Sequence, residues 1–214
     1  PAIFFDLETS DLSPVGQILN YCFTLVDGDW KVLDQISDSV AISRLQLPRA
    51  GAIKANRINV LEHQKLCTLG EAAAMKKIHS FINRAVADLG PGTVRLVGYN
   101  SARFDLDYLR TSLIRNGLNP YFKVKYKDLL LVSRKLSVSE TRFPRVSSGD
   151  EAGRLSLRLE TLCKALGILD GKQLHESSDD VRLTIELARY YADEFGVDVR
   201  SFEPFEASKW VNKG

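Results

Sequence analysis

The sequence predicts an α/β domain with a mixed β-sheet, because its two halves carry different patterns. Residues 1–42 are rich in β-branched and aromatic residues interrupted by turn signals, which favours consecutive antiparallel strands. From residue 71 onward, amphipathic helical segments alternate with short apolar runs, a pattern typical of parallel strands joined by helices. With 214 residues, 44% of them hydrophobic and 26% charged, the chain has the size and composition of a globular domain.

The strands of the first half are predicted from apolar runs and from the turns between them. Ile3–Thr9 is a short apolar run bounded by polar residues, which indicates a buried strand. A second strand is predicted over residues 17–26, and Asp27-Gly28-Asp29 is a hairpin turn signal. A third strand is expected over residues 30–33, and another around residues 38–42.

The second half is predicted to alternate helices with buried strands. Short helical turns are expected over 52–69, longer helices over 71–88, 103–116, 129–136, 157–166 and 178–195, and strands over 93–99 and 124–128. Ser177 or Ser178 is the expected N-cap of the last helix. Residues 137–154, rich in Ser, Gly, Pro and Arg, predict a long loop. We therefore expect one domain over residues 1–195 and an irregular tail over residues 196–214.

Composition narrows the class of protein but does not identify it. No apolar run approaches the length of a membrane span, and no secretory leader pattern is found, so we expect a cytoplasmic protein without a membrane partner. Cys22, Cys67 and Cys163 are widely spaced and odd in number, which favours reduced thiols over disulfides or a zinc site. The net charge of +2 is too small to indicate a nucleic-acid-binding protein by itself.

Two carboxylates in the first strand point to a metal ion. Residues two apart on a strand face the same side, so Asp6 and Glu8 should project together from the end of a buried strand. Adjacent buried like charges repel each other, and a divalent cation with oxygen ligands, Mg²⁺ or Mn²⁺ rather than Zn²⁺, would relieve the repulsion. The alternative is that the strand ends at Leu7 and that Glu8 is simply exposed.

Two further acidic positions open helices. Asp105 follows the strand predicted over 93–99 and lies in the first turn of the next helix, where α/β sheets place ligands. Asp179 and Asp180 begin the last helix, with His175 just before it, and His is suited to proton transfer near neutral pH. The alternatives are ordinary helix N-terminal carboxylates, which the helix dipole favours, and a surface histidine.

Taken together, a D-x-E strand, an Asp that enters a central helix and an H-x4-D that enters the last helix resemble the DEDDh family of 3′–5′ exonucleases, which have a ribonuclease-H-like fold. Asp6, Glu8, Asp105, His175 and Asp180 occupy the five signature positions. The segments Phe4–Ser10, Gly98–Asp105 and Leu155–Leu162 are similar to the exonuclease domain of bacterial exodeoxyribonucleases I. Those enzymes continue into an SH3-like module and a helical region, whereas this chain stops first, as either a fragment or a single-domain relative.

The resemblance implies a ribonuclease-H-like mixed sheet flanked by helices and a site for two Mg²⁺ ions, for which Mn²⁺ would substitute. Asp6 would bridge both ions, Glu8 and Asp180 would complete the site that holds the attacking water, and Asp105 would help to hold the second ion. His175 would act as general base.

Substrate contacts are expected from residues beside these motifs. Thr9 is a candidate for contact with the terminal nucleotide, and Asn100 and Arg103 are candidates for contact with phosphate or base. Ser156 and Arg158 are further candidates. A groove for single-stranded DNA could include the basic side chains and the aromatic ring of the irregular segment, which are Arg134, Lys135, Arg142, Phe143, Arg145 and Arg154. The alternative is a solvated loop.

Three functions are therefore open from the sequence. The first is a metal-dependent exonuclease that releases nucleoside monophosphates from the 3′ end of single-stranded DNA. The second is an RNA 3′-end trimming enzyme on the same scaffold, which would differ by contacts to the 2′-hydroxyl. The third is a weakly catalytic nucleic-acid-binding module in a repair or polymerase complex.

Overall fold

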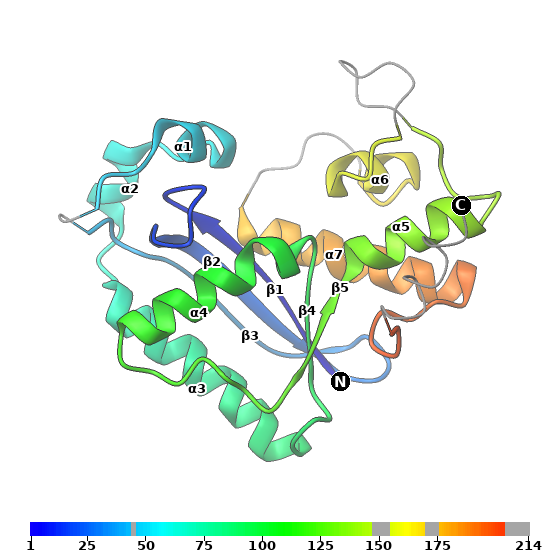
Figure 1. Ribbon diagram of the computed structural model, residues 1–214, viewed down its shortest axis with the longest axis horizontal. Helices are drawn as coiled ribbons and strands as arrows, with labels where there is room; N and C mark the ends of the chain where they lie inside the picture. Colours follow the sequence, from blue (N-terminus) through cyan, green and yellow to red (C-terminus); the bar gives the residue numbers. More distant parts are fainter. Residues whose placement is uncertain (44–45, 147–154, 170–175, 204–214) are drawn as a thin grey trace.

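A five-stranded mixed sheet forms the centre of the molecule (Figure 1). The computed structural model describes residues 1–43, 46–146, 155–169 and 176–203. The strand order is β3-β2-β1-β4-β5. The strands are β1 (Ala2–Thr9), β2 (Ile18–Val26), β3 (Val32–Ser39), β4 (Arg95–Gly98) and β5 (Lys125–Asp128). The predicted α/β class and the mixed sheet are confirmed.

The antiparallel half of the sheet is simpler than the sequence suggested. β3 is one continuous strand that pairs with β2 from Val32 to Ser39, so the separate strand expected around residues 38–42 is wrong. β3 is the edge strand, and its Asp34 and Asp38 are half-buried. Polar residues are common on edge strands because they discourage pairing with other chains. They also interrupted the apolar pattern from which the strand was predicted.

The parallel half gathers three strand ends at one edge. β4 runs parallel to β1, and β5 runs parallel to β4 with Gly98 opposite Asp128. The carboxyl ends of β1, β4 and β5 therefore lie at the same edge, which is at the top of Figure 1. We refer to it as the upper edge, and to the opposite edge as the lower edge. This is the edge at which α/β sheets usually bind ligands.

Helices cover both faces of the sheet (Figure 1). They are α1 (Ala50–Asn56), α2 (Val60–Leu66), α3 (Glu71–Leu89), α4 (Asp105–Arg115), α5 (Leu129–Ser139), α6 (Leu159–Ala165) and α7 (Ser177–Phe195), with a 3₁₀ turn, η1, over Ser101–Arg103. Helices α3 and α4 pack on one face in a core with Ile3 and Phe5, and α5, α6 and α7 pack on the other with Ala2 and Phe4. No helix in the described part of the chain is both long enough and apolar enough to cross a membrane.

Two local predictions at helix ends need correction. Helix α5 continues to Ser139, so the first residues of the predicted loop over 137–154 are helical. The residue that caps α7 is Glu176, and Ser177 is the first residue of the helix. Instead of capping the helix, the Ser177 hydroxyl donates a hydrogen bond to Asn20 on β2, so a tertiary contact replaced the local one.

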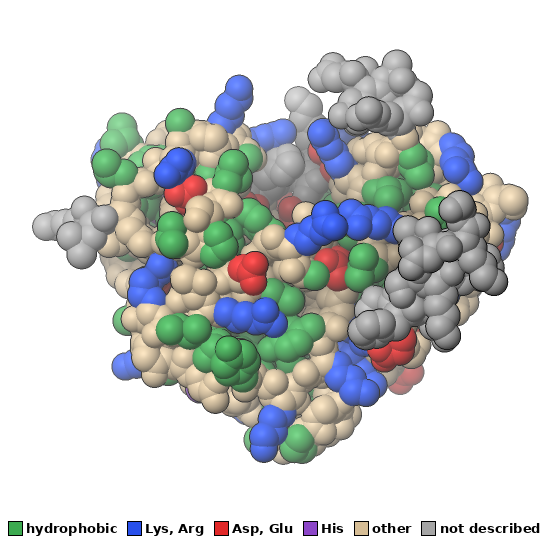
Figure 2. Space-filling view, viewed as in Figure 1, with side chains coloured by type: hydrophobic (Ala, Val, Ile, Leu, Met, Phe, Trp, Pro, Cys, Tyr) green, Lys and Arg blue, Asp and Glu red, His purple; other side chains and the backbone are tan. Residues whose placement is uncertain are grey.

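The upper edge of the sheet is hollowed. Figure 2 shows a depression between the part of the surface built by α1 and α2 and the part built by α6, with acidic side chains inside it and Lys and Arg side chains beside it. The depression lies over the carboxyl ends of β1 and β4, as a comparison with Figure 1 shows. Of the acidic motif residues, Asp6, Glu8 and Asp180 are each half-buried, whereas Asp105 is buried.

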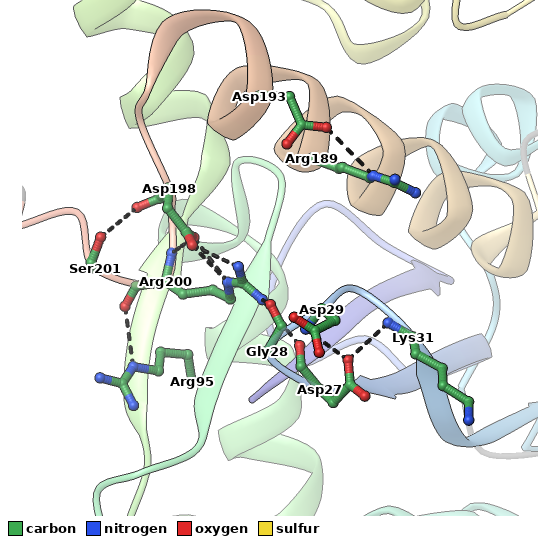
Figure 3. A network of polar contacts seen from close by, with 10 residues as sticks. All are labelled: Asp27, Gly28, Asp29, Lys31, Arg95, Arg189, Asp193, Asp198, Arg200 and Ser201. Atoms are coloured by element: carbon green, nitrogen blue, oxygen red, sulfur yellow. Dashed lines mark hydrogen bonds and ion pairs between the residues drawn. The ribbon is translucent and has the colours of Figure 1, made fainter.

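At the lower edge, the segment that follows α7 ties the strands together (Figure 3). The Arg200 guanidinium pairs with Asp198, donates to the backbone oxygens of Asp27 and Gly28 in the β2–β3 turn, and stacks over Trp30 at 3.8 Å from the ring centroid. Its own backbone oxygen accepts from Arg95 of β4. Residues 196–203 thus pack onto the sheet, and the division of the chain into a domain over 1–195 and a tail over 196–214 stays a prediction.

Candidate active site

Three carboxylates from two distant parts of the chain converge at the upper edge. Asp6 and Glu8 alternate with the buried residues Phe5 and Leu7 on β1, so both carboxylates face the side of the sheet on which α7 packs. Asp180 lies in the first turn of α7. One carboxylate oxygen from each of Asp6, Glu8 and Asp180 lies within 4.8 Å of the other two. The predicted adjacency of Asp6 and Glu8 is present in the structure.

Asn20 brings the start of α7 to this position. It lies on β2 directly opposite Glu8, and its Oδ1 atom accepts hydrogen bonds from both the backbone N–H and the hydroxyl of Ser177. The side-chain amide of Asn20 also donates to the Asp38 backbone oxygen and to the Ser39 hydroxyl on β3. Asn20 therefore fixes the first turn of α7, and with it Asp180, against the sheet. The sequence analysis missed Asn20, because its role depends on a residue 157 positions away.

Asp105 is the fourth acidic residue of the motif set, and it comes from α4. It is the first residue of that helix and is 5% exposed. It lies outside the group of three within 4.8 Å, but close enough for its charge to raise the pKa of both Asp6 and Glu8. All four predicted acidic residues are thus gathered at the same edge.

The crowding of these carboxylates shows in their protonation. Burial, followed by the charges of Asp105, Glu8 and Asp180, raises the pKa of Asp6 well above its usual value. Burial and the charges of Asp180 and Asp105 raise the pKa of Glu8 to about 8. Burial also raises the pKa of Asp105 to about 7, although backbone hydrogen bonds at Asp105 itself and at Leu7 oppose the shift.

The donor set fits hard divalent cations. Among the described residues, no Lys or Arg forms an ion pair with Asp6 or Glu8. Carboxylate oxygens that converge within a few ångströms are the ligands that Mg²⁺ and Mn²⁺ prefer, and a bound cation would lower the raised pKa values of these groups. The site can therefore hold a metal ion, as the D-x-E pattern predicted.

His175, the expected general base, lies outside the described residues, as do residues 170–174 before it. The described chain resumes at Glu176, four residues before Asp180. The role of His175 stays a prediction.

Three of the five predicted substrate contacts line one pocket of about 500 Å³. They are Asn100, Ser156 and Arg158, and Tyr99, Leu130 and Arg134 line it with them. The Tyr99 hydroxyl donates to the Leu157 backbone oxygen and so joins the end of β4 to the segment before α6. Asn100 follows β4 by two residues, so the pocket begins at the same edge of the sheet as the carboxylates.

The other two predicted contacts, Thr9 and Arg103, are not among the residues that line this pocket. Thr9 is 2% exposed, its hydroxyl donates to the Asp11 backbone oxygen, and its own backbone oxygen accepts from Asn56. Arg103 is exposed at the end of η1, two residues before Asp105. A nucleotide contact by either residue stays a prediction, and Arg103 is the one that reaches solvent.

The expected basic groove is only partly present. Arg134 lines the pocket with Asn100. Lys135 lies over the Phe202 ring, and Arg142 lies over the Phe195 ring and donates to the Glu194 backbone oxygen. Phe143 is 1% exposed and packs with Tyr191 and Phe195, so the prediction that it stacks on a base is wrong. Arg145 is exposed, and Arg154 lies outside the described residues.

Comparisons with known proteins address the fold. No protein-family model and no curated protein matches the chain. Solved structures of E. coli exonuclease I do match: a complex with a dT13 oligonucleotide has a TM-score of 0.77 and 26% sequence identity, and covers 89% of this chain and 40% of that chain. The chain has the exonuclease I fold. The resemblance stated from the sequence motifs, and the ribonuclease-H-like mixed sheet that it implied, are therefore confirmed.

Other exonuclease I structures agree with this result. A zinc-bound complex of E. coli exonuclease I with single-stranded DNA has a TM-score of 0.77 at 25% identity, and a complex with the SSB C-terminus has a TM-score of 0.75 at 26% identity. Each covers 90% of this chain. The chain spans only about 40% of the length of the exonuclease I chains that it matches.

Proposed function

We propose that the chain is a metal-dependent 3′–5′ exonuclease that hydrolyses single-stranded DNA to nucleoside monophosphates. The observation that carries the proposal is the convergence of Asp6, Glu8 and Asp180 within 4.8 Å at the carboxyl end of β1. The exonuclease I fold, which extends over about 90% of the chain, supports the same reaction.

Phosphodiester hydrolysis needs an activated water and a stabilised leaving oxygen, and two bound divalent ions, Mg²⁺ by preference, would supply both. Asp6, Glu8 and Asp180 would hold the ion nearest the attacking water, with Asp6 shared between the two, and Asp105 would hold the second. His175 would accept the proton of the water, since an imidazole titrates near neutral pH. The carboxylates would thus bind the cations, and the imidazole of His175 would move the proton.

The pocket at the same edge of the sheet as the carboxylates supports a nucleic-acid substrate. Its lining combines two guanidinium groups, of Arg134 and Arg158, with the Asn100 amide and the Ser156 hydroxyl. Guanidinium groups suit phosphate because they donate in a planar, bidentate geometry. The exonuclease I structures that contain dT13 or dA16 oligonucleotides favour DNA as the polymer.

Oligonucleotides labelled at one end test the proposal. With Mg²⁺ or Mn²⁺, a 5′-labelled single strand should shorten step by step, and a 3′-labelled strand should release its label as a mononucleotide at once. EDTA and the Asp6→Asn variant should stop both. A failure to shorten the 3′ end with either metal contradicts the proposal.

Two further arms of the assay separate the alternatives. A matched RNA strand that is shortened faster than DNA would indicate an RNA-trimming enzyme. An oligonucleotide that binds equally well in EDTA and in Mg²⁺, without turnover, would indicate a binding module.

A further inference from the structure

Asp128 makes an unusual set of contacts for a buried carboxylate outside the acidic cluster. It is the last residue of β5, is 8% exposed, and accepts three hydrogen bonds from backbone N–H groups. Its Oδ1 atom accepts from Asn100 at 2.8 Å and from Leu130 at 3.0 Å, and its Oδ2 atom accepts from Ala102 at 3.1 Å. Two of the three donors belong to the β4–α4 turn, and the third belongs to the first turn of α5.

The β4–α4 turn has a tight backbone path that these contacts hold. Asn100 adopts the left-handed conformation, with φ 63° and ψ 15°, a conformation that few residues other than glycine adopt and that Asn tolerates better than most. A Cβ atom at Gly98 would collide with the Ser101 side chain, so the chain passes through the turn at very close range. Within the described residues, the buried Ser101 hydroxyl finds no hydrogen-bond partner. The Asp128 carboxylate therefore contributes two of the polar contacts that hold this turn in place.

Two functional features depend on the geometry of that turn. Asp105 begins α4 five residues after Asn100, and η1 connects the two. Asn100 of the turn lines the 500 Å³ pocket, as do Leu130 and Arg134 of α5. Because Asp128 accepts hydrogen bonds from both Asn100 and Leu130, it connects two segments that line the pocket, and one of them is the turn that leads to Asp105.

We propose that Asp128 is a positioning residue for the nuclease, which fixes the β4–α4 turn so that Asp105 and the pocket side chain of Asn100 are correctly placed. This inference rests on the proposed function. It assigns no contact with substrate or metal to Asp128 itself. The alternative is that Asp128 serves only as the N-cap of α5, since its contact with Leu130 is a normal capping bond.

Three substitutions separate positioning from capping. Asp128→Ser keeps a good N-cap for α5 but is too short to reach Asn100 and Ala102 as well. Asp128→Asn keeps an oxygen acceptor for Asn100 and Leu130, but it loses the contact with Ala102 and the carboxylate charge, which helps to raise the pKa of Asp105. The matched control is Asp27→Ser, because Asp27 is also a carboxylate that accepts two backbone N–H bonds of a turn, from Asp29 and Lys31, but lies at the lower edge.

Each variant is assayed for kcat and KM on a single-stranded oligonucleotide well below its thermal midpoint, so that loss of fold does not contribute. Asp128→Ser should lose about 10- to 100-fold in kcat/KM, the usual cost of removing a group that orients a metal ligand. Asp128→Asn should recover most of that loss, and Asp27→Ser should match the unmodified protein. If Asp128→Ser keeps the kcat and KM of the unmodified protein, the positioning role is overturned and only the N-cap remains.

A second readout does not depend on turnover. In metal-free protein without DNA, amide hydrogen exchange at Asn100 and Ala102 should be faster in Asp128→Ser than in the unmodified chain, and exchange at Leu130 should change little. Oligonucleotide affinity in EDTA should fall in the same variant. If the unmodified protein has no nuclease activity, the proposed function fails, whereas exchange and affinity still decide the inference. Unchanged exchange, or faster exchange with unchanged affinity and kcat, overturns it.

Discussion

The acidic cluster at the upper edge of the sheet and the carboxylates at the lower edge are held in opposite ways. At the lower edge, Asp198 pairs with Arg200, and Asp27 accepts backbone N–H bonds from its own turn (Figure 3). At the upper edge, Asp6 and Glu8 lie beside other carboxylates, and in the described part of the chain no ion pair with Lys or Arg involves them. At the lower edge the chain itself supplies a counterion to Asp198 and hydrogen-bond donors to Asp27, whereas the carboxylates of Asp6, Glu8 and Asp180 are arranged to receive a cation.

Two glutamates show the effect of this difference on protonation. Lys127 donates a hydrogen bond to Glu203, which lowers the pKa of that carboxyl below its usual value. Burial and neighbouring carboxylates raise the pKa of Glu8 to about 8. In a site that stabilises the fold, a side chain of the protein supplies the positive charge that a carboxylate needs. In a metal site, the bound cation supplies it. The following predictions test that distinction, from the largest expected effect to the smallest.

Asp6→Ala should abolish turnover, because it removes the carboxylate that all the other acidic groups surround. The thermal midpoint of the metal-free protein should not fall, since the substitution relieves repulsion among buried like charges. Activity assays and thermal unfolding in EDTA measure the two effects. A large loss of stability would show that Asp6 is part of the folding core instead.

His175→Ala should lower kcat by roughly 10²–10⁴-fold, the usual contribution of a general base. The dependence of kcat on pH should also lose its titration near neutral pH. His79 is a half-buried histidine on α3 whose backbone oxygen accepts a hydrogen bond from Asn83. It offers the control substitution His79→Ala, which should leave kcat unchanged. Full activity in His175→Ala would remove the proton-transfer assignment.

Arg200→Ala should cost about 2–3 kcal/mol in the free energy of unfolding and leave kcat unchanged, because the side chain makes charged hydrogen bonds and a cation–π contact at the lower edge. Chemical denaturation measures the first effect, and the oligonucleotide assay measures the second. Lower kcat at full folding would mean that the two edges are coupled.

The metal-free protein should lose stability as pH rises. Folding raises the pKa of Glu8 from 4.5 to about 8 and that of Asp105 from 3.8 to about 7, so the folded state binds more protons than the unfolded state between these values. This contribution is fully present below about pH 4 and is lost as pH rises through 7 and 8. Mg²⁺ should oppose the loss, and should raise the thermal midpoint more at pH 8 than at pH 6, where protons compete with it.

Unfolding in EDTA across this pH range measures the slope. Glu8→Gln should flatten it, since the amide does not titrate. A metal-free protein whose stability rises between pH 5 and pH 8 would contradict the raised pKa values.

Arg189→Ala should change the free energy of unfolding by only about 0.3–0.5 kcal/mol, because its pair with Asp193 is an exposed i,i+4 contact on α7 (Figure 3). Comparison with Arg200→Ala by the same denaturation method then separates a surface pair from the buried network. An equal cost for both would show that burial does not decide the difference.

The sequence by itself determined much of the local structure. Period-two alternation along β1 placed Phe4 and Phe5 in opposite cores and put Asp6 and Glu8 on one face, and helical periodicity located α3 and α7 closely. These features depend on residues close together in the chain. The motif set was found by resemblance to a family, because nothing local shows that positions 6, 105 and 180 meet.

Only the tertiary structure decided how the side chains of Asp6, Asp105 and Asp180 are brought together. The Asn20–Ser177 contact places Asp180, the Asp128 carboxylate holds the turn before Asp105, and the packing of Tyr191 and Phe195 buries Phe143. Each of these contacts joins residues that are far apart in the sequence and that become neighbours only through strand register and helix packing. Local sequence patterns carry no information about such distant neighbours, so a side chain's partner, unlike its strand or helix, had to be read from the fold.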